Sequence, residues 1–498
     1  MAMKMKHLLH KLPAERDLRA VPRPYINHSV ELKKSFTPEE RAGMLEAVGL
    51  NVFFFPSEMI TGCDLLSDSG VTTMTGEQWA ALHMGDEAYG SNRGYFMLKD
   101  QVRETFGSAF FNEPGVGEPN AFLFHQGRAS EDALFSQLGK TGTDLIIPSN
   151  GHFDTTGANI EANTMHALNL FSDELAAPLS NAAFKGNMNV PALEALLEAS
   201  HDRVPLVYLT ITNNTAGGQP VSMANIREVR RITDEYSIPL FFDGCRFAEN
   251  AWFIKQFEPG YADKQIKDIV REMFSHADGF TISFKKDGLV NMGGGLFIRN
   301  GGLFTKKYPH LPGMILDYQI LTEGHPTYGG LCGRDIMALV SGLRIVTGCE
   351  YLTHRIEQVR RFGAEMSGRG IPVLNPVGGH AVYVDINRFF EGTAMKPDDF
   401  GGISLCAVLL AAYGHRACEL GYFTFGRYDR DKEREIHPQL NFVRFAVPRL
   451  RYERQDLDSV VASMEALYEN RDGIPGVRVM YGRELPLRHF KARFEFNK

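Results

Sequence analysis

The sequence predicts an α/β protein with a mainly parallel central sheet in a large domain and a smaller α+β domain. In the middle of the chain, short apolar runs alternate with helical patterns, as strands and helices do in βαβ units. In the last third, runs typical of half-exposed antiparallel strands precede an amphipathic helix. The 498 residues exceed the roughly 250–300 that one hydrophobic core serves. We expect an N-terminal arm with part of the small domain at 1–70, a large domain at 71–345 and the rest of the small domain at 346–498.

Four buried strands and a capped helix are expected in the large domain. The apolar runs that predict the strands are 144–148, 206–212, 240–243 and 279–283. Between the second and third, Ser222 can cap a helix, because its hydroxyl can accept from a free backbone N–H. The apolar residues that follow Ser222 are spaced by three and four and form one helix face. Strand, helix and strand at this spacing favour a parallel sheet.

The small domain is predicted from three segments near the C-terminus. Residues 379–386 and 441–447 alternate as antiparallel strands do, and 455–470 has the apolar spacing of an amphipathic helix. Residues 396–402 have the composition of a surface loop.

The bulk composition excludes several kinds of partner. A net charge of −7 argues against nucleic acid and against an anionic membrane as the main partner. No apolar run reaches the ~18–20 residues of a membrane span, and the N-terminus lacks the apolar stretch of a secretory signal. The six cysteines form no C-x-x-C pair and have no metal-site spacing. We therefore expect a cytoplasmic protein with reduced thiols.

Lys285 and Lys286 lie at the end of a predicted buried strand, where lysine is unusual. A lysine with a buried stem can lose its proton and act as an amine nucleophile toward an aldehyde. Gly293–Gly295 would let the backbone pass close to a ligand. The alternative is a surface turn between two strands.

Three further segments carry residues that could surround the same ligand. Asp243 ends a predicted strand 43 positions before Lys286, where it could hold a protonated ring nitrogen or simply cap a turn. Gln126, Gly127 and Arg128 precede a helical pattern, so this turn could bind a phosphate or be an ordinary helix start. Asn214 follows another strand, beside a ligand or in a Gly-Pro turn.

Taken together, the chain resembles the β-eliminating lyases, the family of tryptophanase and tyrosine phenol-lyase. The matching stretches span nearly the whole chain: 64–70 (DLLSDSG), 84–91 (MGDEAYGS), 125–128 (HQGR), 216–225 (AGGQPVSMAN), 246–250 (RFAEN), 285–294 (KKDGLVNMGG), 326–331 (PTYGGL), 378–382 (GGHAV) and 443–449 (VRFAVPR). The resemblance implies a PLP-dependent transferase-like (type I) fold, pyridoxal 5′-phosphate (PLP) as cofactor, K⁺ as a bound ion, and a homotetramer with active sites at subunit interfaces.

The resemblance also implies cofactor-binding roles for individual residues. Lys286 resembles the lysine that holds PLP as a Schiff base, Asp243 the partner of the pyridine nitrogen, and Phe153 the ring that stacks on the cofactor. The phosphate would be held by Gln126, Gly127, Arg128, Ser283 and Lys285, and the 3-oxygen would lie near Asn214 and Arg246.

Substrate and ion contacts follow from the same resemblance. Arg444 resembles the arginine that binds the substrate carboxylate, assisted by Ser67, Ser69 and Asn214. Tyr89 matches a proton donor near the leaving group, and Tyr328 matches a residue contributed across the subunit interface. Glu87 and Asn291 align with residues around the monovalent cation.

Three positions predict the substrate. Asp154, His489 and Leu420 resemble tryptophanases, whereas tyrosine phenol-lyases have threonine, phenylalanine and arginine there. We therefore expect a carbon–carbon lyase that converts L-tryptophan to indole, pyruvate and ammonia. His325 and the bulky stretch that begins at Phe53 depart from the family pattern near the substrate. The alternatives are a lyase acting on tyrosine, S-substituted cysteine or another β-substituted amino acid, and a non-catalytic PLP-binding protein.

Overall fold

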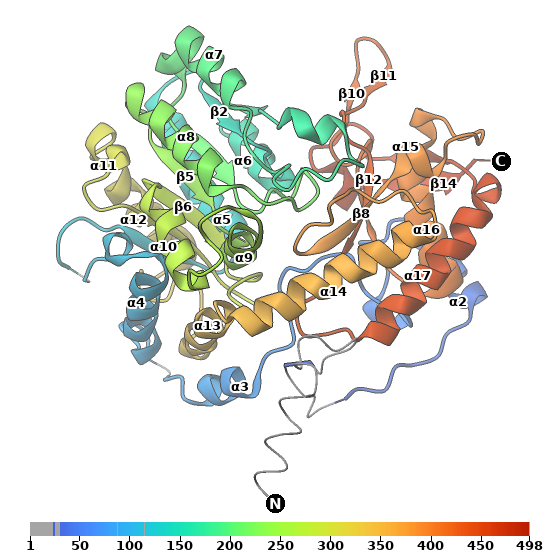
Figure 1. Ribbon diagram of the computed structural model, residues 1–498, viewed down its shortest axis with the longest axis horizontal. Coiled ribbons are helices and arrows are strands. Elements are labelled where there is room, and N and C mark those ends of the chain that lie inside the picture. The colour runs from blue at the N-terminus through green and yellow to red at the C-terminus, as the bar shows by residue number, and fades with distance from the viewer. Residues whose placement is uncertain (1–22, 25–29, 87, 114, 498) are drawn as a thin grey trace, which may run out of the picture. The chain divides into compact units, whose positions relative to one another are not determined.

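The central feature is a seven-stranded mixed sheet in the order β1-β7-β6-β5-β4-β2-β3 (Figure 1). This computed structural model describes residues 23–24, 30–86, 88–113 and 115–497, and residues 34–498 form one compact unit. Five neighbouring strands are parallel, namely β3, β2, β4, β5 and β6. β7 is antiparallel to both of its neighbours, β6 and β1. The strands are β1 (Ala121–Phe124), β2 (Ile146–Ser149), β3 (His166–Asn169), β4 (Val207–Thr210), β5 (Leu240–Asp243), β6 (Gly279–Ser283) and β7 (Gly294–Ile298).

Helices cover both faces of this sheet because its strands are apolar on both sides. Successive residues of β4 show the alternation, since Leu209 packs in one hydrophobic cluster and Tyr208 in another. One face is covered by α4 (Arg93–Phe106), α7 (Val190–Ser200), α8 (Met223–Glu235), α9 (Phe247–Phe257), α10 (Ile266–Ser275) and α13 (Gly333–Val346). The other is covered by α5 (Gly127–Leu138), α6 (Asp154–Ala162), α11 (Leu303–Lys307) and α12 (Leu311–Glu323).

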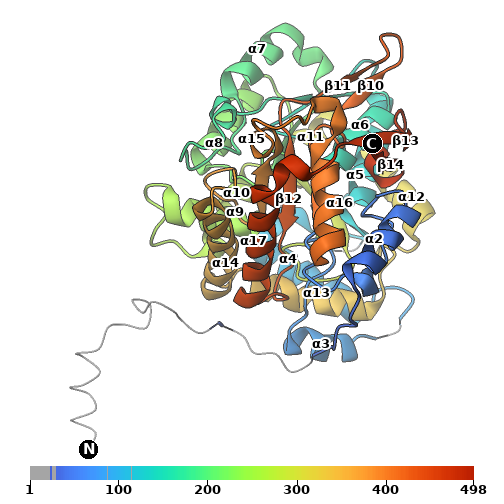
Figure 2. The same ribbon diagram turned by 90° about the vertical axis from the view of Figure 1, so that its right-hand side faces the viewer.

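A second, three-stranded antiparallel sheet has the order β8-β12-β9. It comprises β8 (Ala381–Asp385), β9 (Cys418–Leu420) and β12 (Phe442–Ala446). Figure 2 shows α14 (Cys349–Gly368), α17 (Arg454–Glu469), α16 (Gly401–Tyr413) and α2 (Pro38–Ala47) side by side over it. Shorter elements are α3 (Gly76–His83), α15 (Ile386–Phe389) and the hairpins β10 (Arg427–Asp429) with β11 (Arg434–Ile436) and β13 (Val477–Tyr481) with β14 (Arg493–Phe496).

The helix α14 connects the two hydrophobic regions. Leu352 and Ile356, near its start, pack with the large sheet, whereas Val359, Phe362 and Met366 pack with residues 45–65 and the C-terminal elements. The predicted domain boundaries at 70 and 345 remain predictions. Of the described helices, no single one is long and apolar enough to span a membrane, and only the bent pair α13 and α14 reaches that length and composition together.

The predicted elements are confirmed with small shifts at their ends. All four strands of the large domain form, and the Ser222 side chain accepts from the N–H of Asn225, as a cap of α8. β8 and β12 pair antiparallel, and the apolar residues of α17 are buried. The predicted loop 396–402 is shorter than expected, because α16 begins at Gly401.

Candidate active site

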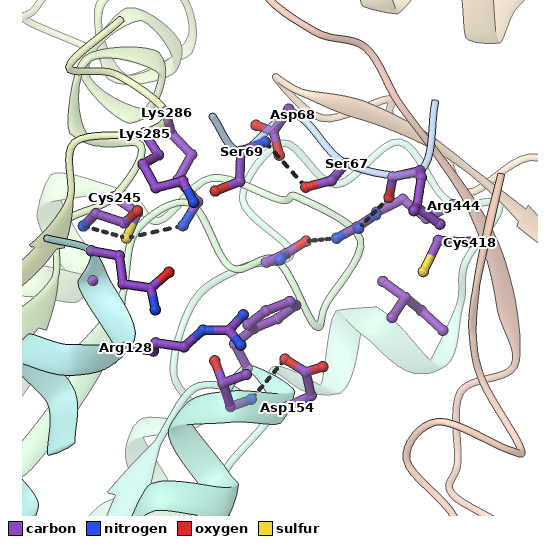
Figure 3. Close-up of a pocket in the computed structure, with 18 of the residues that line it drawn as sticks. Ser67, Asp68, Ser69, Arg128, Asp154, Cys245, Lys285, Lys286, Cys418 and Arg444 are labelled. Carbon is purple, nitrogen blue, oxygen red and sulfur yellow. Dashed lines mark hydrogen bonds between the residues drawn. The ribbon is translucent and has the colours of Figure 1, made fainter. Parts of the chain in front are cut away.

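A cavity of about 190 Å³ lies at the carboxyl edge of the large sheet (Figure 3). Asp243 ends β5, and Lys286 follows three residues after the end of β6. Open parallel sheets bind ligands at this edge. Most of the predicted site residues line the cavity, although they come from distant parts of the chain: Phe53, Ser67, Ser69, Gln126, Gly127, Arg128, Phe153, Asp154, Asn214, Asp243, Arg246, Ser283, Lys285, Lys286, Leu420, Arg444 and His489.

Lys286 lies in a cluster with Asp243 and Cys245. Its Nζ is 3.8 Å from the sulfur of Cys245, and Figure 3 shows these two side chains facing each other. The same sulfur accepts from the N–H of Ser283 at 3.1 Å, and the N–H of Cys245 donates to Asp243 Oδ1 at 3.1 Å. Burial and the carboxylate of Asp243 raise the pKa of the Cys245 thiol, so it stays protonated near neutral pH. A primary amine, a thiol and a carboxylate are thus held within one small space.

Lys285 has a different environment from its neighbour. Burial, the charge of Lys286 and the charge of Arg128 lower the pKa of Lys285. Its stem packs against Gly70, where a Cβ would lie 2.5 Å from Lys285 Cε. Only a residue without a side chain fits there, so the lysine's position depends on this glycine. Lys285 therefore adds positive charge beside Arg128 at this end of the cavity.

The N-terminus of α5 is shaped to bind an anion. Gly127 begins the helix, and a Cβ on it would lie 2.5 Å from Ser283 Cβ, so the backbone of α5 presses directly against the end of β6. Gln126 precedes the helix without making a side-chain cap, which leaves the first N–H groups of α5 available. Helix N-termini of this kind bind phosphate, and Arg128 supplies further positive charge.

Arg444 reaches the cavity from β12 in the other sheet. Its Nη2 donates to the carbonyl of Leu66 at 2.9 Å, and its Nη1 lies 3.4 Å from Asn214 Oδ1. Asn214 is held in place by Tyr383, whose hydroxyl donates to the same oxygen at 2.6 Å. The Nε of Arg444 is buried and has no hydrogen-bond partner among the described residues. A guanidinium with donors to spare is suited to binding a carboxylate.

Asp154 and His489 form a buried, hydrogen-bonded pair in the same cavity. Asp154 is the first residue of α6, directly after Phe153, and its Oδ2 lies 3.0 Å from His489 Nε2. The other carboxylate oxygen accepts from the N–H of Thr155 at 2.6 Å. The ring of Phe53 is 5.7 Å from the imidazole. The carboxylate is therefore fixed in orientation beside largely apolar neighbours.

Sequence reasoning missed Asp68, which lies between the predicted Ser67 and Ser69. Its carboxylate accepts from Arg246 at 2.7 and 3.1 Å and from Arg449 at 3.0 Å. Burial raises the pKa of Asp68, but Arg246, His380 and Arg449 outweigh it and hold this pKa well below its usual range. An acid between two predicted binding serines was the available signal. Asp68 keeps the Arg246 side chain in the cavity wall.

Glu131 is a second cavity residue that sequence reasoning missed. It follows Gly127 by four positions, which places both on one face of α5. Its Oε1 accepts from the hydroxyl of Thr156 at 2.7 Å. Burial and the charge of Asp243 raise the pKa of Glu131 to about 8, so the side chain is mostly protonated at neutral pH. The one-turn spacing from Gly127 was the signal for it.

A Glu131→Gln variant should change how stability depends on pH. Because the folded-state pKa of about 8 exceeds the ordinary value of 4.5, Glu131 favours folding most below 4.5, and this contribution is lost as pH rises toward 8. Glutamine does not ionise, so the variant's free energy of unfolding should fall less steeply between these pH values. Urea denaturation across that range measures the difference, with the exposed Glu198→Gln as control. Parallel curves for wild type and Glu131→Gln would contradict the assignment.

Four predicted site residues do not line the cavity. Tyr89, His325 and Tyr328 form a separate aromatic group, with Tyr89 5.7 Å from His325 and 5.8 Å from Tyr328, ring to ring. Tyr89 is 77% exposed. The exposed Asn291 donates to the carbonyl of Gly70 at 3.0 Å. Glu87, predicted at the cation site, lies outside the described residues.

Comparison with known proteins places the chain in a family. The model of the family described as "Beta-eliminating lyase" matches residues 64–463. The chain is 42% identical to a tryptophanase from Salinibacter ruber, over 94% of both chains. It is 40% identical to a tryptophanase from Hyphomonas neptunium, over 96% of this chain and all of the relative. It is 39% identical to a tyrosine phenol-lyase from Symbiobacterium sp., over 95% of this chain and 98% of the relative.

Solved structures share the fold at much lower identity. A threonine aldolase from Leishmania major has a TM-score of 0.53 at 14% identity, covering 81% of this chain and 99% of its own. A serine palmitoyltransferase from Sphingomonas wittichii has a TM-score of 0.52 at 13% identity, covering 83% of this chain and 89% of its own. The predicted fold class is confirmed by this likeness and by the mixed sheet. With its sequence matched over nearly its full length, the chain belongs to the beta-eliminating lyase family.

Proposed function

We propose that the chain uses PLP to eliminate the side chain of L-tryptophan, so that tryptophan and one water give indole, pyruvate and ammonia. The observation that carries the choice of tryptophan is the Asp154–His489 pair in the cavity wall. A fixed carboxylate can accept a hydrogen bond from the indole N–H and stabilise the positive charge that develops there when the ring carbon is protonated. Family membership and the tryptophanase relatives support the same assignment.

The cavity residues fit PLP in charge and shape. The amine of Lys286 would hold the aldehyde carbon, the carboxylate of Asp243 the ring nitrogen, and the N-terminus of α5 with Arg128 the phosphate. A side chain on Gly127 would collide with Ser283, so glycine is needed for α5 to begin this close to the end of β6. When bound, PLP withdraws electrons from the substrate's α-carbon and makes the α-proton acidic.

Three side chains account for handling the substrate. The guanidinium of Arg444, which lines the cavity, binds the substrate carboxylate and so orients the amino acid. The Nζ of Lys286 accepts the α-proton. Asp154 accepts the indole N–H at the other end of the substrate. Each of these tasks requires a group that the structure places in the cavity wall.

Tyrosine is the competing substrate, and overall identity does not separate the two. The tryptophanase and tyrosine phenol-lyase relatives are 42% and 39% identical to this chain. The cavity favours tryptophan because Leu420 contributes an apolar wall with no donor for a phenolate. The carboxylate of Asp154 would moreover repel a phenolate leaving group, because both groups are negatively charged.

A steady-state panel with tryptophan, tyrosine and S-methyl-L-cysteine tests the proposal. We expect pyruvate from tryptophan, with indole in equal amount and the highest kcat/KM of the three. Phenol or methanethiol without indole would overturn the choice of substrate. Binding of PLP without turnover of any amino acid would indicate a non-catalytic PLP-binding protein.

Replacing Asp154 should lower activity selectively. In Asp154→Asn the side chain keeps its size but loses the charge that accepts the indole N–H. We expect kcat/KM for tryptophan to fall by about 10²-fold or more. S-methyl-L-cysteine has no N–H in its leaving group, so its kcat/KM should change only a few-fold. The ratio of the two substrates is the measurement, and an equal loss for both would contradict a leaving-group role.

We also propose that the enzyme is a cytoplasmic homotetramer that binds K⁺. The exposed Tyr89, with the half-buried His325 and Tyr328 beside it, would then complete the active site of a neighbouring copy, where Tyr89 could donate a proton to the leaving group. The rigidity of this aromatic group supports such a role, because the hydroxyl of Thr327 lies 2.8 Å from His325 Nδ1. Sedimentation of the holoenzyme at the mass of one copy, or equal activity with and without K⁺, would contradict the respective part of this proposal.

A further inference from the structure

His489 borders a second, smaller cavity in addition to the one it shares with Asp154. This cavity measures about 20 Å³, and its walls include Phe53, Cys406, Glu419 and Thr424. A buried cavity needs roughly 10–15 Å³ and at least two polar partners to hold a water molecule. By volume it therefore accommodates one water.

The imidazole of His489 has one edge that points away from Asp154. Its Nε2 lies 3.0 Å from Asp154, which borders only the larger of the two cavities. Its Nδ1 is buried and has no hydrogen-bond partner in the described part of the chain. The large majority of buried polar side-chain atoms in proteins have a hydrogen-bond partner, which a bound water can supply. The edge of the ring that carries the unpaired Nδ1 is therefore the edge that can face the smaller cavity.

Glu419 offers a polar group on the opposite wall. Its side chain is buried, and its two oxygens accept from the N–H of Phe423, the N–H of Thr424 and the hydroxyl of Thr424 at 3.0, 3.0 and 2.7 Å. A carboxylate has about four acceptor positions, so one remains free. Burial raises the pKa of Glu419, while its bonds to Thr424 and Phe423 and the nearby His489 lower it.

The other sides of the imidazole are already occupied. The rings of Phe53 and Phe490 lie 5.7 and 4.1 Å from it, centroid to centroid. Asn51 holds the backbone by donating to the carbonyl of His489 at 3.0 Å. The position of the ring is therefore set by packing, and what is left to determine is which nitrogen carries the proton.

We propose that one water molecule occupies this small cavity and bridges His489 Nδ1 to Glu419, which makes Glu419 a positioning residue for the Asp154–His489 pair. The water donates one hydrogen to Nδ1, and a second hydrogen bond joins it to the Glu419 carboxyl. Because Nδ1 then accepts, the neutral ring carries its proton on Nε2 and donates it to Asp154. This bond keeps the carboxylate of Asp154 turned toward the leaving group. The catalytic consequence rests on the proposed function, whereas the bridge itself does not.

Filling the cavity tests the inference without changing either bridged side chain. Cys406, on α16, lines the cavity, and Cys406→Met adds bulk that displaces a water, whereas the matched control Cys406→Ala leaves room for it. High-resolution crystals without substrate should show one water between His489 Nδ1 and Glu419 in wild type and Cys406→Ala, and none in Cys406→Met. A dry cavity in wild type would overturn the proposal.

Two further measurements separate a positioning role from a structural one. The ¹⁵N shifts of the His489 ring, assigned with His489→Gln, should report a proton on Nε2 and a hydrogen-bonded Nδ1 in wild type, and change in Cys406→Met only. In the holoenzyme, kcat/KM for tryptophan should fall about tenfold in Cys406→Met, while that for S-methyl-L-cysteine should not. If Cys406→Met loses the water but keeps the wild-type ¹⁵N shifts of His489 and the wild-type ratio of the two kcat/KM values, Glu419 has no positioning role.

A second pair of variants serves if Cys406→Met does not fold. Ile403 lines the same cavity one turn earlier on α16, so Ile403→Phe should fill it and Ile403→Val should not. For this pair we expect the same results as for the Cys406 pair: the same electron density for the water, the same ¹⁵N shifts of His489 and the same ratio of kcat/KM for the two substrates. Wild type that releases no indole would refute the proposed function, but the density and the ring shifts would still decide whether the bridge exists.

Discussion

Replacing Lys286 by alanine is expected to abolish elimination while leaving the protein folded. The loss should reach about 10⁴-fold or more, because the variant lacks both the nucleophile for the cofactor and the base for the α-proton. Folding should survive, since Lys286 forms no ion pair with any of the described residues and the one hydrogen-bond partner of its amine among them is the sulfur of Cys245. Initial rates of pyruvate formation measure the loss, and the thermal unfolding midpoint checks the fold.

The site of covalent attachment can be read independently of activity. After borohydride reduction of the wild-type holoenzyme, mass spectrometry should find the phosphopyridoxyl group on Lys286, and Lys286→Ala should carry none. The matched variant is Lys285→Ala, which removes the neighbouring lysine. It should retain the label on Lys286 and bind the cofactor more weakly, because it lacks one of the positive charges at the phosphate end. Label on Lys285 would show that the two lysines had been assigned in the wrong order.

The parts of the fold that follow local patterns could be predicted from the sequence. β5 and β6 were predicted at the right places because buried strands are short apolar runs, and the carboxyl ends of parallel strands meet at one edge. Asp243 and Lys286 lie at such ends, so their proximity follows from the order of elements alone. Ser222 could be predicted as a cap because capping depends on residues only three positions apart.

Contacts set by packing between distant segments could not be predicted in this way. The bond between Asp154 and His489 joins the start of α6 to a short turn near the C-terminus, and only a family resemblance linked the two residues. Tyr89 was expected near the leaving group, yet in the single chain it is exposed, lies beside His325 and does not line the cavity. No local pattern indicated that Arg449 would be buried, because an arginine in a loop after a strand is usually exposed.

Arg449 anchors the segment after β6 that carries Lys286 and Asp287. Its side chain is fully buried and donates to Asp68 at 3.0 Å, to Glu249 at 2.7 Å and to Asp287 at 2.9 Å. Asp287 directly follows Lys286. The arginine therefore binds three carboxylates from separate segments of the chain, and one of those segments carries Lys286.

Arg449→Met is expected to lower the free energy of unfolding by about 3–5 kcal/mol, because Asp287 loses its cationic partner, while Asp68 and Glu249 keep only Arg246 and Arg355. Methionine matches the apolar stem, so the loss reflects charge more than volume. Urea denaturation at equal PLP concentration measures it. The control is Arg478→Met, which breaks an exposed pair with Glu495 at 2.8 Å and should cost less than about 1 kcal/mol. A similar loss in both variants would show that the buried network contributes no more than a surface pair.

The destabilisation of Arg449→Met should also depend on pH. Burial and the charge of Glu249 raise the pKa of Asp287 to about 6, and Arg449 partly opposes this increase. Without Arg449 the pKa of Asp287 rises further, so near pH 6 the carboxyl takes up a proton and the uncompensated charge disappears. The difference in stability between variant and wild type should therefore be smaller at pH 6 than at pH 8. An equal difference at both pH values would mean that the lost stability arises from packing around the arginine stem rather than from its charge.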